Sequence, residues 1–462
     1  MTDDTMNHLR VLVPAGMLGS GFPAETITNG IALGADAIVV DGGSTDSGPH
    51  YLGTATAKTS AAAVRRDLEI LLTSAADADI PLIVSSCGTS GTDAGVDWIT
   101  ELVVAIAEHH DLHLRLAQIY AEQHAGTLLA ALDAGRIRPL APPRPLSPAT
   151  LRSCTHIVGV LGSEPIADAL RAGAQVVLTG RATDTAPVAA LAETLDIAPG
   201  PAWHAAKTTE CGGLCTTNPL AGVLVDIDAT GFTVESLDPG AAATPTTVAA
   251  HLIYENADPF RMREPSGTLD TCNARYLAID ERRVRVTGSV FEPAEQKTVK
   301  LEGAALAGYE TLSLVGIRDP HILSHVDTWT ATLETVLAER VGAVLCLAPN
   351  DYRIAIARYG DNAILGDLEL ERGTPREVLV LLKVRASTQD LATSIAKIAN
   401  PLLLHLPLPG MDHLPSFAFA TSPAEVERGA AYEFVLNHTV DVATPEELFR
   451  TKHSEVGHDH AR

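Results

Sequence analysis

The chain has 462 residues, of which 57 are acidic and 33 are basic, so its formal net charge is −24. This length suffices for two or three domains with sizeable cores, and 46% apolar against 19% charged residues excludes an intrinsically disordered chain. Strong acidity without a basic run excludes a nucleic-acid scaffold. An anionic substrate would therefore have to meet local positive groups inside a negatively charged body.

Neither a membrane span nor an export signal is expected. No run of about 18 uninterrupted apolar residues occurs, and the first eight residues are polar and acidic. The 6 cysteines are spread thinly along the chain, which is typical of reduced thiols and predicts a cytoplasmic protein. Cys211 and Cys215 form a lone C-x3-C with no second Cys/His pair at zinc spacing, so this pattern is weak evidence for structural zinc.

Short apolar runs alternate with amphipathic stretches through the first half of the chain. Strands without polar alternation are predicted at residues 9–13, 37–40, 82–84, 114–120, 157–161 and 175–178. Between them, residues 64, 68, 71, 72 and 75 share one face of a predicted helix. The alternation predicts an α/β fold with a doubly wound, mostly parallel sheet.

Changes in the pattern of apolar and polar residues along the chain suggest domain boundaries. Residues 1–220 are expected to form an α/β ligand-binding domain, with a proline-rich connector at 139–148. Residues 221–375 contain short, nearly alternating strands and predict an antiparallel insertion that completes the site. A small C-terminal α/β unit is expected at 376–452 and a disordered tail at 453–462.

Polar loops follow several predicted strands, where ligands of open parallel sheets bind. The loop at 41–53 is longer than a βα turn requires and contains Asp41, Ser44, Thr45 and Asp46. These groups suit a metal or the oxygens of a substrate, whereas the alternative is a structural loop with capping hydroxyls. Glu122 and Gln123 follow the strand predicted at residues 114–120.

Two charged groups lie further along the chain. Arg181 at a strand terminus can hold a carboxylate bidentately, with Asp184 orienting it, although the two can equally form a local ion pair. His204, Lys207 and Glu210 are spaced three apart, so neighbours share a helix face. A desolvated lysine beside a carboxylate suits acid–base catalysis, whereas on a surface helix the same residues form an ordinary charged face.

These clusters together resemble the acyclic terpene utilisation AtuA family, in particular its longer bacterial members. The resemblance runs from about residue 9 to 450 and is carried by residues 41–53, 122–123, 180–185, 204–212, 244–251, 254–260, 264–270, 291–295, 298–303 and 316–320. Leu406 and Leu408 depart from it, because some relatives have tyrosines there. The resemblance implies a catabolic enzyme of branched terpenoid acids, and ammonia-lyase labels on some relatives favour lyase chemistry.

We therefore expect a lyase, of the hydratase/dehydratase or C–C/C–N type, that acts on a branched or hydroxylated carboxylic acid, free or CoA-linked. Lys207, Glu210, Asp41 and His204 are the predicted catalytic residues. The predicted substrate-binding residues are Arg181, Asp184, Ser44, Thr45, Asp46, Gln123 and Lys300.

A divalent metal, if used, would take Asp41, Asp46 and Glu122 as oxygen ligands. The alternative is a non-catalytic binding subunit that needs a small partner chain to complete its site. A homodimer or higher homo-oligomer is expected from its frequency among proteins, and neither nucleic acid nor membrane is an expected partner.

Overall fold

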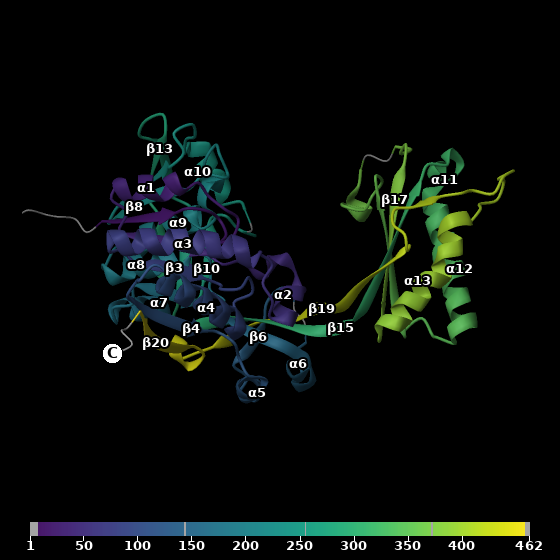
Figure 1. Ribbon diagram of the computed structural model, residues 1–462, viewed down its shortest axis with the longest axis horizontal. Coiled ribbons are helices and arrows are strands. Elements are labelled where there is room, and N and C mark those ends of the chain that lie inside the picture. Colours follow the sequence, from purple (N-terminus) through teal and green to yellow (C-terminus); the bar gives the residue numbers. More distant parts are fainter. Residues whose placement is uncertain (1–7, 143–144, 255, 371–372, 458–462) are drawn as a thin grey trace, which may run out of the picture. The chain divides into compact units, whose positions relative to one another are not determined.

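The computed structural model describes residues 8–142, 145–254, 256–370 and 373–457 (Figure 1). The chain divides into two compact units, one made of Met1–Ala305 with Phe434–Arg462 and the other of Leu306–Glu433. The boundaries expected near residues 220 and 375 fall inside these units. Residues 143–144 of the proline-rich stretch, Glu255 and the end of the tail from 458 lie outside the described residues.

The first unit contains a 10-stranded sheet, in the order β12-β13-β9-β8-β1-β2-β3-β7-β4-β20, within its described residues. Its parallel middle comprises β1 (Leu9–Val13), β2 (Ala37–Asp41), β3 (Leu82–Ser85), β7 (Val176–Thr179) and β4 (Leu114–Tyr120). The antiparallel strands beside β1 are β8 (Val223–Asp228), β9 (Gly231–Ser236), β13 (Arg283–Thr287) and β12 (Arg275–Ala278). The prediction of an α/β fold is confirmed, with sheets that mix parallel and antiparallel strands.

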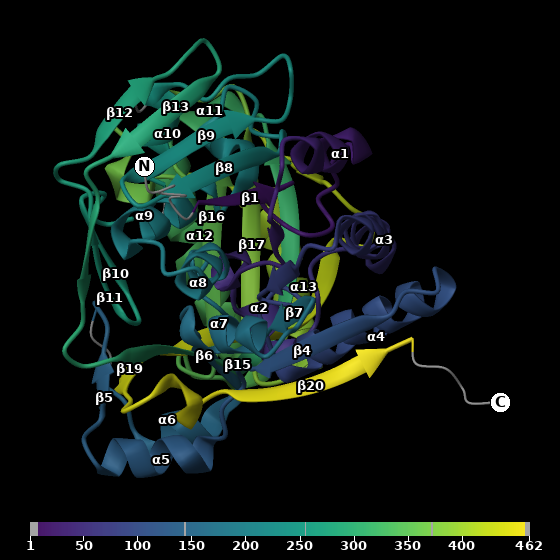
Figure 2. The same cartoon turned by 90° about the vertical axis from the view of Figure 1, so that its left-hand side faces the viewer.

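Helices pack on both faces of this sheet (Figure 2). Those on one face are α1 (Ala24–Ala32), α3 (Ala61–Ala78) and α4 (Asp93–His109), and those on the other are α7 (Glu164–Arg171), α8 (Ala186–Thr194) and α9 (Pro199–Thr209). Successive strand side chains alternate between two cores because the side-chain period of a strand is two: Leu12 packs on one side and Val11 on the other. The apolar face of α3 is buried as predicted.

Further elements complete the first unit. Its other helices are α2 (Pro49–Thr54), α5 (Ala125–Asp133), α6 (Pro148–Ser153) and α10 (Pro245–His251), with short 3-10 helices at Thr45–Ser47, Gly212–Cys215 and Pro445–Glu447. A three-stranded antiparallel sheet consists of β10 (Arg261–Glu264), β11 (Gly267–Asp270) and β14 (Val290–Pro293). The remaining strands are β5 (Ile137–Pro139) and β6 (Cys154–Val160).

One predicted strand of the parallel sheet lies elsewhere. Residues 157–161 largely coincide with β6, but β6 pairs antiparallel with the first half of β15 (Thr298–Ile317). An apolar run does not specify its partner, so the sequence pattern could not separate β6 from the parallel strands. The pairing brings Lys300 and Glu302 of β15 beside the loops of the large sheet.

The chain leaves the first unit through β15 and returns to it through β19 (Glu425–Asp441). The second unit contains β16 (Tyr352–Tyr359), β17 (Val378–Ala386) and β18 (Ala418–Phe419), and the helices α11 (Pro320–Ser324), α12 (Val326–Leu345) and α13 (Gln389–His405), with a 3-10 helix at Gly366–Leu368. Trp329 and Leu333 of α12 are fully buried against β15 and β17. None of the described helices is both long and apolar enough to cross a membrane.

The tail corrects another expectation. Residues 453–456, expected to be disordered, belong to β20 (Arg450–Val456), which pairs antiparallel with β4 along its length. Figure 2 shows β20 running beside β4 at the edge of the sheet. Disorder was predicted from the polar sequence of this segment. An edge strand is also polar, because it exposes much of its surface to water, while its backbone still satisfies the hydrogen bonds of β4.

Truncation of the chain after Phe449 removes β20 and exposes the edge of β4. We expect a lower midpoint of thermal unfolding and concentration-dependent aggregation, because an unpaired strand edge offers free backbone donors and acceptors. Differential scanning calorimetry and light scattering measure both effects. Truncation after Gly457 keeps β20 and is the matched control; equal behaviour of the two truncations would contradict a structural role for β20.

Candidate active site

A cavity of about 740 Å³ lies in the first unit. It is bounded by the loop after β7, the end of α9, the strand β10 and the start of β15. Five of the predicted site residues line it: Arg181, Asp184, Lys207, Glu210 and Lys300. Segments more than a hundred residues apart thus supply one polar cavity.

The buried carboxylate of Glu302 organises one wall. Its Oε2 accepts hydrogen bonds from Arg181 Nε at 3.4 Å and Thr45 Oγ1 at 2.9 Å, and its Oε1 accepts one from Lys300 Nζ at 2.6 Å. Burial by itself raises the pKa of Glu302, but the cations Arg181 and Lys300 outweigh burial and lower the pKa below its ordinary value. Glu302 is therefore an ionised anchor for both cations.

Arg181 is held on several sides. Its Nη1 donates to Ser86 Oγ at 3.2 Å and to Asp184 Oδ1 at 3.4 Å, and its backbone N–H donates to the carbonyl of Gly91 at 3.0 Å. Gly91 has φ +64°, and a Cβ there would lie 2.1 Å from the Arg181 backbone nitrogen. Glycine is therefore required where the loop after β3 touches the loop after β7.

Lys207 and Glu210 form the predicted pair at the end of α9. Lys207 Nζ donates to Glu210 Oε1, and both side chains are buried. Burial raises the pKa of Glu210 well above its ordinary value, and Asp184 and Glu264 add to the effect against the attraction of Lys207. Glu210 therefore holds a proton more tightly than an ordinary carboxyl group.

The pKa values of two other buried carboxyl groups lie near 7. Burial, with repulsion from Asp184, raises the pKa of Asp41 to about 7, although Arg181 and a hydrogen bond from Ser85 Oγ oppose the shift. Burial also raises the pKa of Glu264 to about 7, against hydrogen bonds from Thr185 and Thr183. Carboxyl groups that change protonation near pH 7 are characteristic of acid–base sites.

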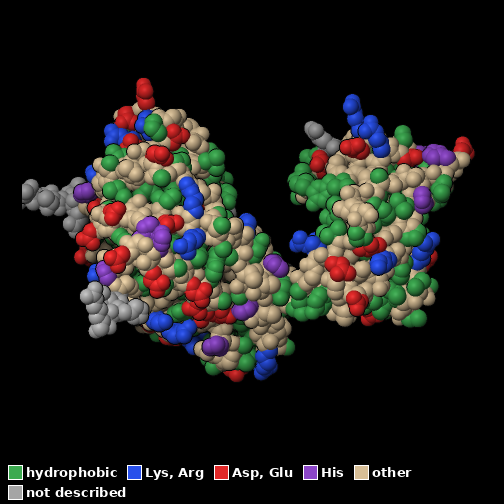
Figure 3. All heavy atoms as spheres, in the orientation of Figure 1, with side chains coloured by type: hydrophobic (Ala, Val, Ile, Leu, Met, Phe, Trp, Pro, Cys, Tyr) green, Lys and Arg blue, Asp and Glu red, His purple; other side chains and the backbone are tan. Residues whose placement is uncertain are grey.

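The cavity lining combines both signs of charge. Its cationic side chains are Arg181, Lys207, Arg261, Arg263 and Lys300, and its acidic ones are Asp184, Glu210, Asp258, Glu264 and Glu302. When Glu210 and Glu264 carry protons, the cations outnumber the carboxylates. Figure 3 shows many acidic side chains over the visible surface, so the cavity contrasts with the acidic exterior.

The loop after β2 lines two adjoining cavities. Asp41, Ser44 and Asp46 line one of about 280 Å³ that shares Asp184 and Glu210 with the large cavity. Thr45 and Asp46 line another of about 360 Å³ that shares Arg181, Lys300 and Glu302 with it. The structure thus brings all four predicted loop residues next to the main cavity.

His204 is not brought to the cavity. It lies on the same helix as Lys207, but its ring Nδ1 is 2.5 Å from Ser289 Oγ and its Nε2 is 3.3 Å from the Tyr276 hydroxyl. Burial lowers the pKa of His204 to about 3, which leaves a neutral histidine in the core. A spacing of three residues predicts that His204 and Lys207 are neighbours on the helix, but it does not determine what each side chain contacts.

Gln123 and Glu122 also lie outside the cavities described. Gln123 Nε2 donates to the carbonyls of Ala121 at 2.9 Å and Leu448 at 2.6 Å. Glu122 Oε1 lies 2.5 Å from His156 Nδ1, and its Oε2 accepts the Asp93 N–H at 3.1 Å. Among the described residues, Asp41, Asp46 and Glu122 do not form a potential metal-binding group.

Sequence reasoning missed Glu302, Glu264 and His251. All three belong to the region after residue 220, where Lys300 was the one predicted site residue. Glu302 follows Lys300 by two positions and therefore shares its strand face, a signal that was available. His251, whose Nε2 is 3.9 Å from Glu210 Oε1, had no local signal at all.

The chain matches the family described as acyclic terpene utilisation family protein AtuA over residues 36–438. That match includes every site residue discussed above. The chain belongs to the AtuA family. No curated protein and no solved structure matches it, so the family match stands alone, and it assigns the chain a role in acyclic terpene utilisation.

Leu406 and Leu408, where this AtuA-family chain departs from some relatives, lie in the second unit. Both are buried in its apolar core, and the Trp329 indole N–H donates to the carbonyl of Leu406 at 3.0 Å. Neither lines a cavity described in the structure. Their surroundings therefore do not connect this departure with the candidate site.

Replacement of Glu264 by glutamine tests the raised pKa. A carboxyl whose pKa is about 7 when folded and about 4.5 when unfolded binds more protons in the folded state between these values, so stability falls as pH rises through this window. E264Q should therefore be more stable than the wild type by about 1–3 kcal/mol at pH 8 and nearly equal to it at pH 4.

Urea unfolding across this pH range measures the difference. The matched control is Glu292→Gln, because Glu292 pairs with Arg261 at the exposed surface. A constant difference between E264Q and the wild type at all pH values would contradict the proton uptake.

Proposed function

We propose that this AtuA-family protein is a lyase of the hydratase/dehydratase or C–C/C–N type, acting on a branched or hydroxylated carboxylic acid, free or CoA-linked. The observation that carries the proposal is the cavity in which Lys207 and Glu210 meet Arg181 and Lys300. The family's role in terpene utilisation agrees with a branched acid as substrate. The proposal covers both substrate binding and movement of the proton.

Binding of an anion is supported by the cations of the cavity. Arg181 and Lys300 are both held by Glu302, so their charges are positioned before substrate arrives. Arg263 lines the cavity and has no ion pair in the described part of the chain. Its guanidinium is therefore available to a carboxylate, which it can bind bidentately.

Proton transfer is assigned to the buried pair. In the dehydration direction, ionised Glu210 accepts the proton from the carbon next to the carboxyl or thioester group, while Lys207 stabilises the negative charge that develops on its oxygen. Protonated Asp41 then donates to the departing hydroxide, the C–O bond breaks, and alkene and water result. The pKa of Asp41 near 7 suits this exchange because both protonation states are populated.

Ser44, Thr45 and Asp46 would orient the hydroxyl group of the substrate. Asp46 accepts a hydrogen bond from Ser44 Oγ at 2.7 Å and lines both adjoining cavities. His204, Gln123 and Glu122 have no part in this proposal, because each is engaged away from the cavity.

Lys207→Met tests the assignment. Methionine keeps the length of the side chain, and Glu210, whose pKa burial raises, can take up a proton when its partner is removed, so no buried charge is left unpaired. We expect kcat/KM to fall by about 10²–10⁴-fold on branched 3-hydroxy acids or their CoA thioesters, measured as alkene formation by mass spectrometry.

Lys297→Met is the matched control, since Lys297 pairs with Glu164 at 3.0 Å and does not line the large cavity. Its turnover should equal that of the wild type. Wild-type turnover in K207M would contradict the assignment of proton transfer to Lys207 and Glu210. Binding of the acids by calorimetry with no turnover in the wild type would favour the alternative of a binding subunit.

A further inference from the structure

Three potential metal ligands meet where α9 ends and α10 ends. Glu210, Cys211 and His251 each offer one ligand atom, and these atoms all lie within 4.8 Å of one another. Glu210 and Cys211 are adjacent in the chain, whereas His251 comes from the other helix. The exposed fractions of Glu210 and His251 are 6% and 4%, so this group is shielded from bulk water.

Two polar atoms of this group have no hydrogen-bond partner. They are Glu210 Oε2 and His251 Nε2, and both are buried. A buried polar atom without a partner is unfavourable, so two such atoms in one group call for a ligand. His251 Nε2 is 3.9 Å from Glu210 Oε1, too far for a hydrogen bond but suitable for two ligands of one ion.

The side chains around the group suit a cation. The His251 side chain is buried, and its Nε2, which has no hydrogen-bond partner, lies 3.9 Å from the Glu210 carboxylate. Tyr254 stacks on the His251 ring with centroids 5.8 Å apart and holds its orientation. Asp184 and Glu264, which lie close enough to Glu210 to affect its pKa, offset the charge of Lys207.

We propose that Glu210, Cys211 and His251 form a zinc site. Oxygen, thiolate sulfur and imidazole nitrogen are all ligands of Zn²⁺, and a set of three leaves a fourth position open. Glu210 and Cys211 line the adjoining cavity of about 280 Å³, which gives that position access to solvent or substrate. A zinc-bound Glu210 would not serve as the base of the proposed lyase reaction, so the two assignments compete for this carboxylate, and metal binding, which is measured without turnover, tests the zinc site separately.

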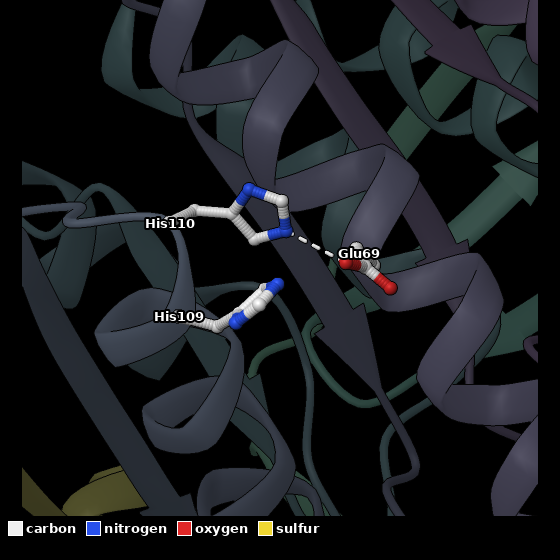
Figure 4. Close-up of side chains that lie close together, drawn as sticks. All are labelled: Glu69, His109 and His110. Atoms are coloured by element: carbon white, nitrogen blue, oxygen red, sulfur yellow. Dashed lines mark hydrogen bonds and ion pairs between the residues drawn. The ribbon is translucent and has the colours of Figure 1, made fainter.

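A second group of three potential metal ligands lies at the surface, but its carboxylate already has a partner. Figure 4 shows Glu69, His109 and His110, with the Glu69 carboxylate already joined to His110 Nε2 at 2.6 Å. His109 is exposed and Glu69 is part of an ordinary surface ion pair. This surface group therefore needs no metal and provides the control for nonspecific zinc.

The experiment compares four proteins after chelator treatment and dialysis against a small excess of zinc: wild type, Cys211→Ser, His251→Gln and the double variant His109→Ala/His110→Ala. We expect about one zinc per chain in the wild type and in the surface variant, measured by mass spectrometry of the metal. C211S and H251Q should bind zinc at least about tenfold more weakly. Circular dichroism and thermal unfolding in chelator check that each variant folds.

Cobalt(II) gives a readout specific to the thiolate. Wild-type protein loaded with cobalt should show a sulfur-to-cobalt charge-transfer band that C211S lacks and that Cys272→Ser, at an exposed cysteine, retains. Absence of zinc from the wild type, absence of the band, or loss of zinc in the surface variant alone would each overturn the site. If a ligand variant fails to fold, the band in the wild type and in C272S decides.

Discussion

The structure of the site depends on the cost of burying charge. Arg181, Glu302, Lys207 and Glu210 are all largely removed from water, and an isolated ion in such surroundings would lose several kcal/mol of hydration. Each therefore has an opposite charge beside it: Lys207 and Glu210 are three residues apart, whereas Arg181 and Glu302 come from distant segments of the chain. Arg181 after β7 meets Glu302 on β15, so the parallel sheet and the long antiparallel strand are tied together at the cavity.

The same constraint explains the unusual protonation of the site. Burial is the main cause that raises the pKa values of Asp41, Glu210 and Glu264, and repulsion from Asp184 adds to it, so these carboxyl groups hold protons at higher pH. Glu302, between two cations, does the opposite and stays ionised. One group of residues thus combines a fixed ionic anchor with exchangeable protons, which is the arrangement that acid–base chemistry on an anion requires.

Much of the fold could be predicted from residue patterns, and the errors share a cause. The strands β1, β2, β3, β4 and β7 were predicted because buried parallel strands are continuous apolar runs. Three features could not be predicted, because each depends on which distant segment supplies the partner. They are the pairing of β6 with β15, the docking of β20 and the division into two units. For the candidate site, residues were predicted from their place after strands or on one helix, and those that lie at the cavities are in the loop 41–46 or are Arg181, Asp184, Lys207, Glu210 and Lys300. His204, Gln123 and Glu122 were chosen by the same reasoning, yet the structure gives each of them partners elsewhere.

The sequence by itself determined the α/β class, the strands of the central sheet and the loops that carry polar groups at their ends, since these follow from local hydrophobicity and turn chemistry. Only the tertiary structure decided which charges are paired, which carboxyls are forced to hold protons and that His251 lies beside Glu210. Those properties depend on burial and on distances across the fold, and neither is encoded in the spacing of neighbouring residues.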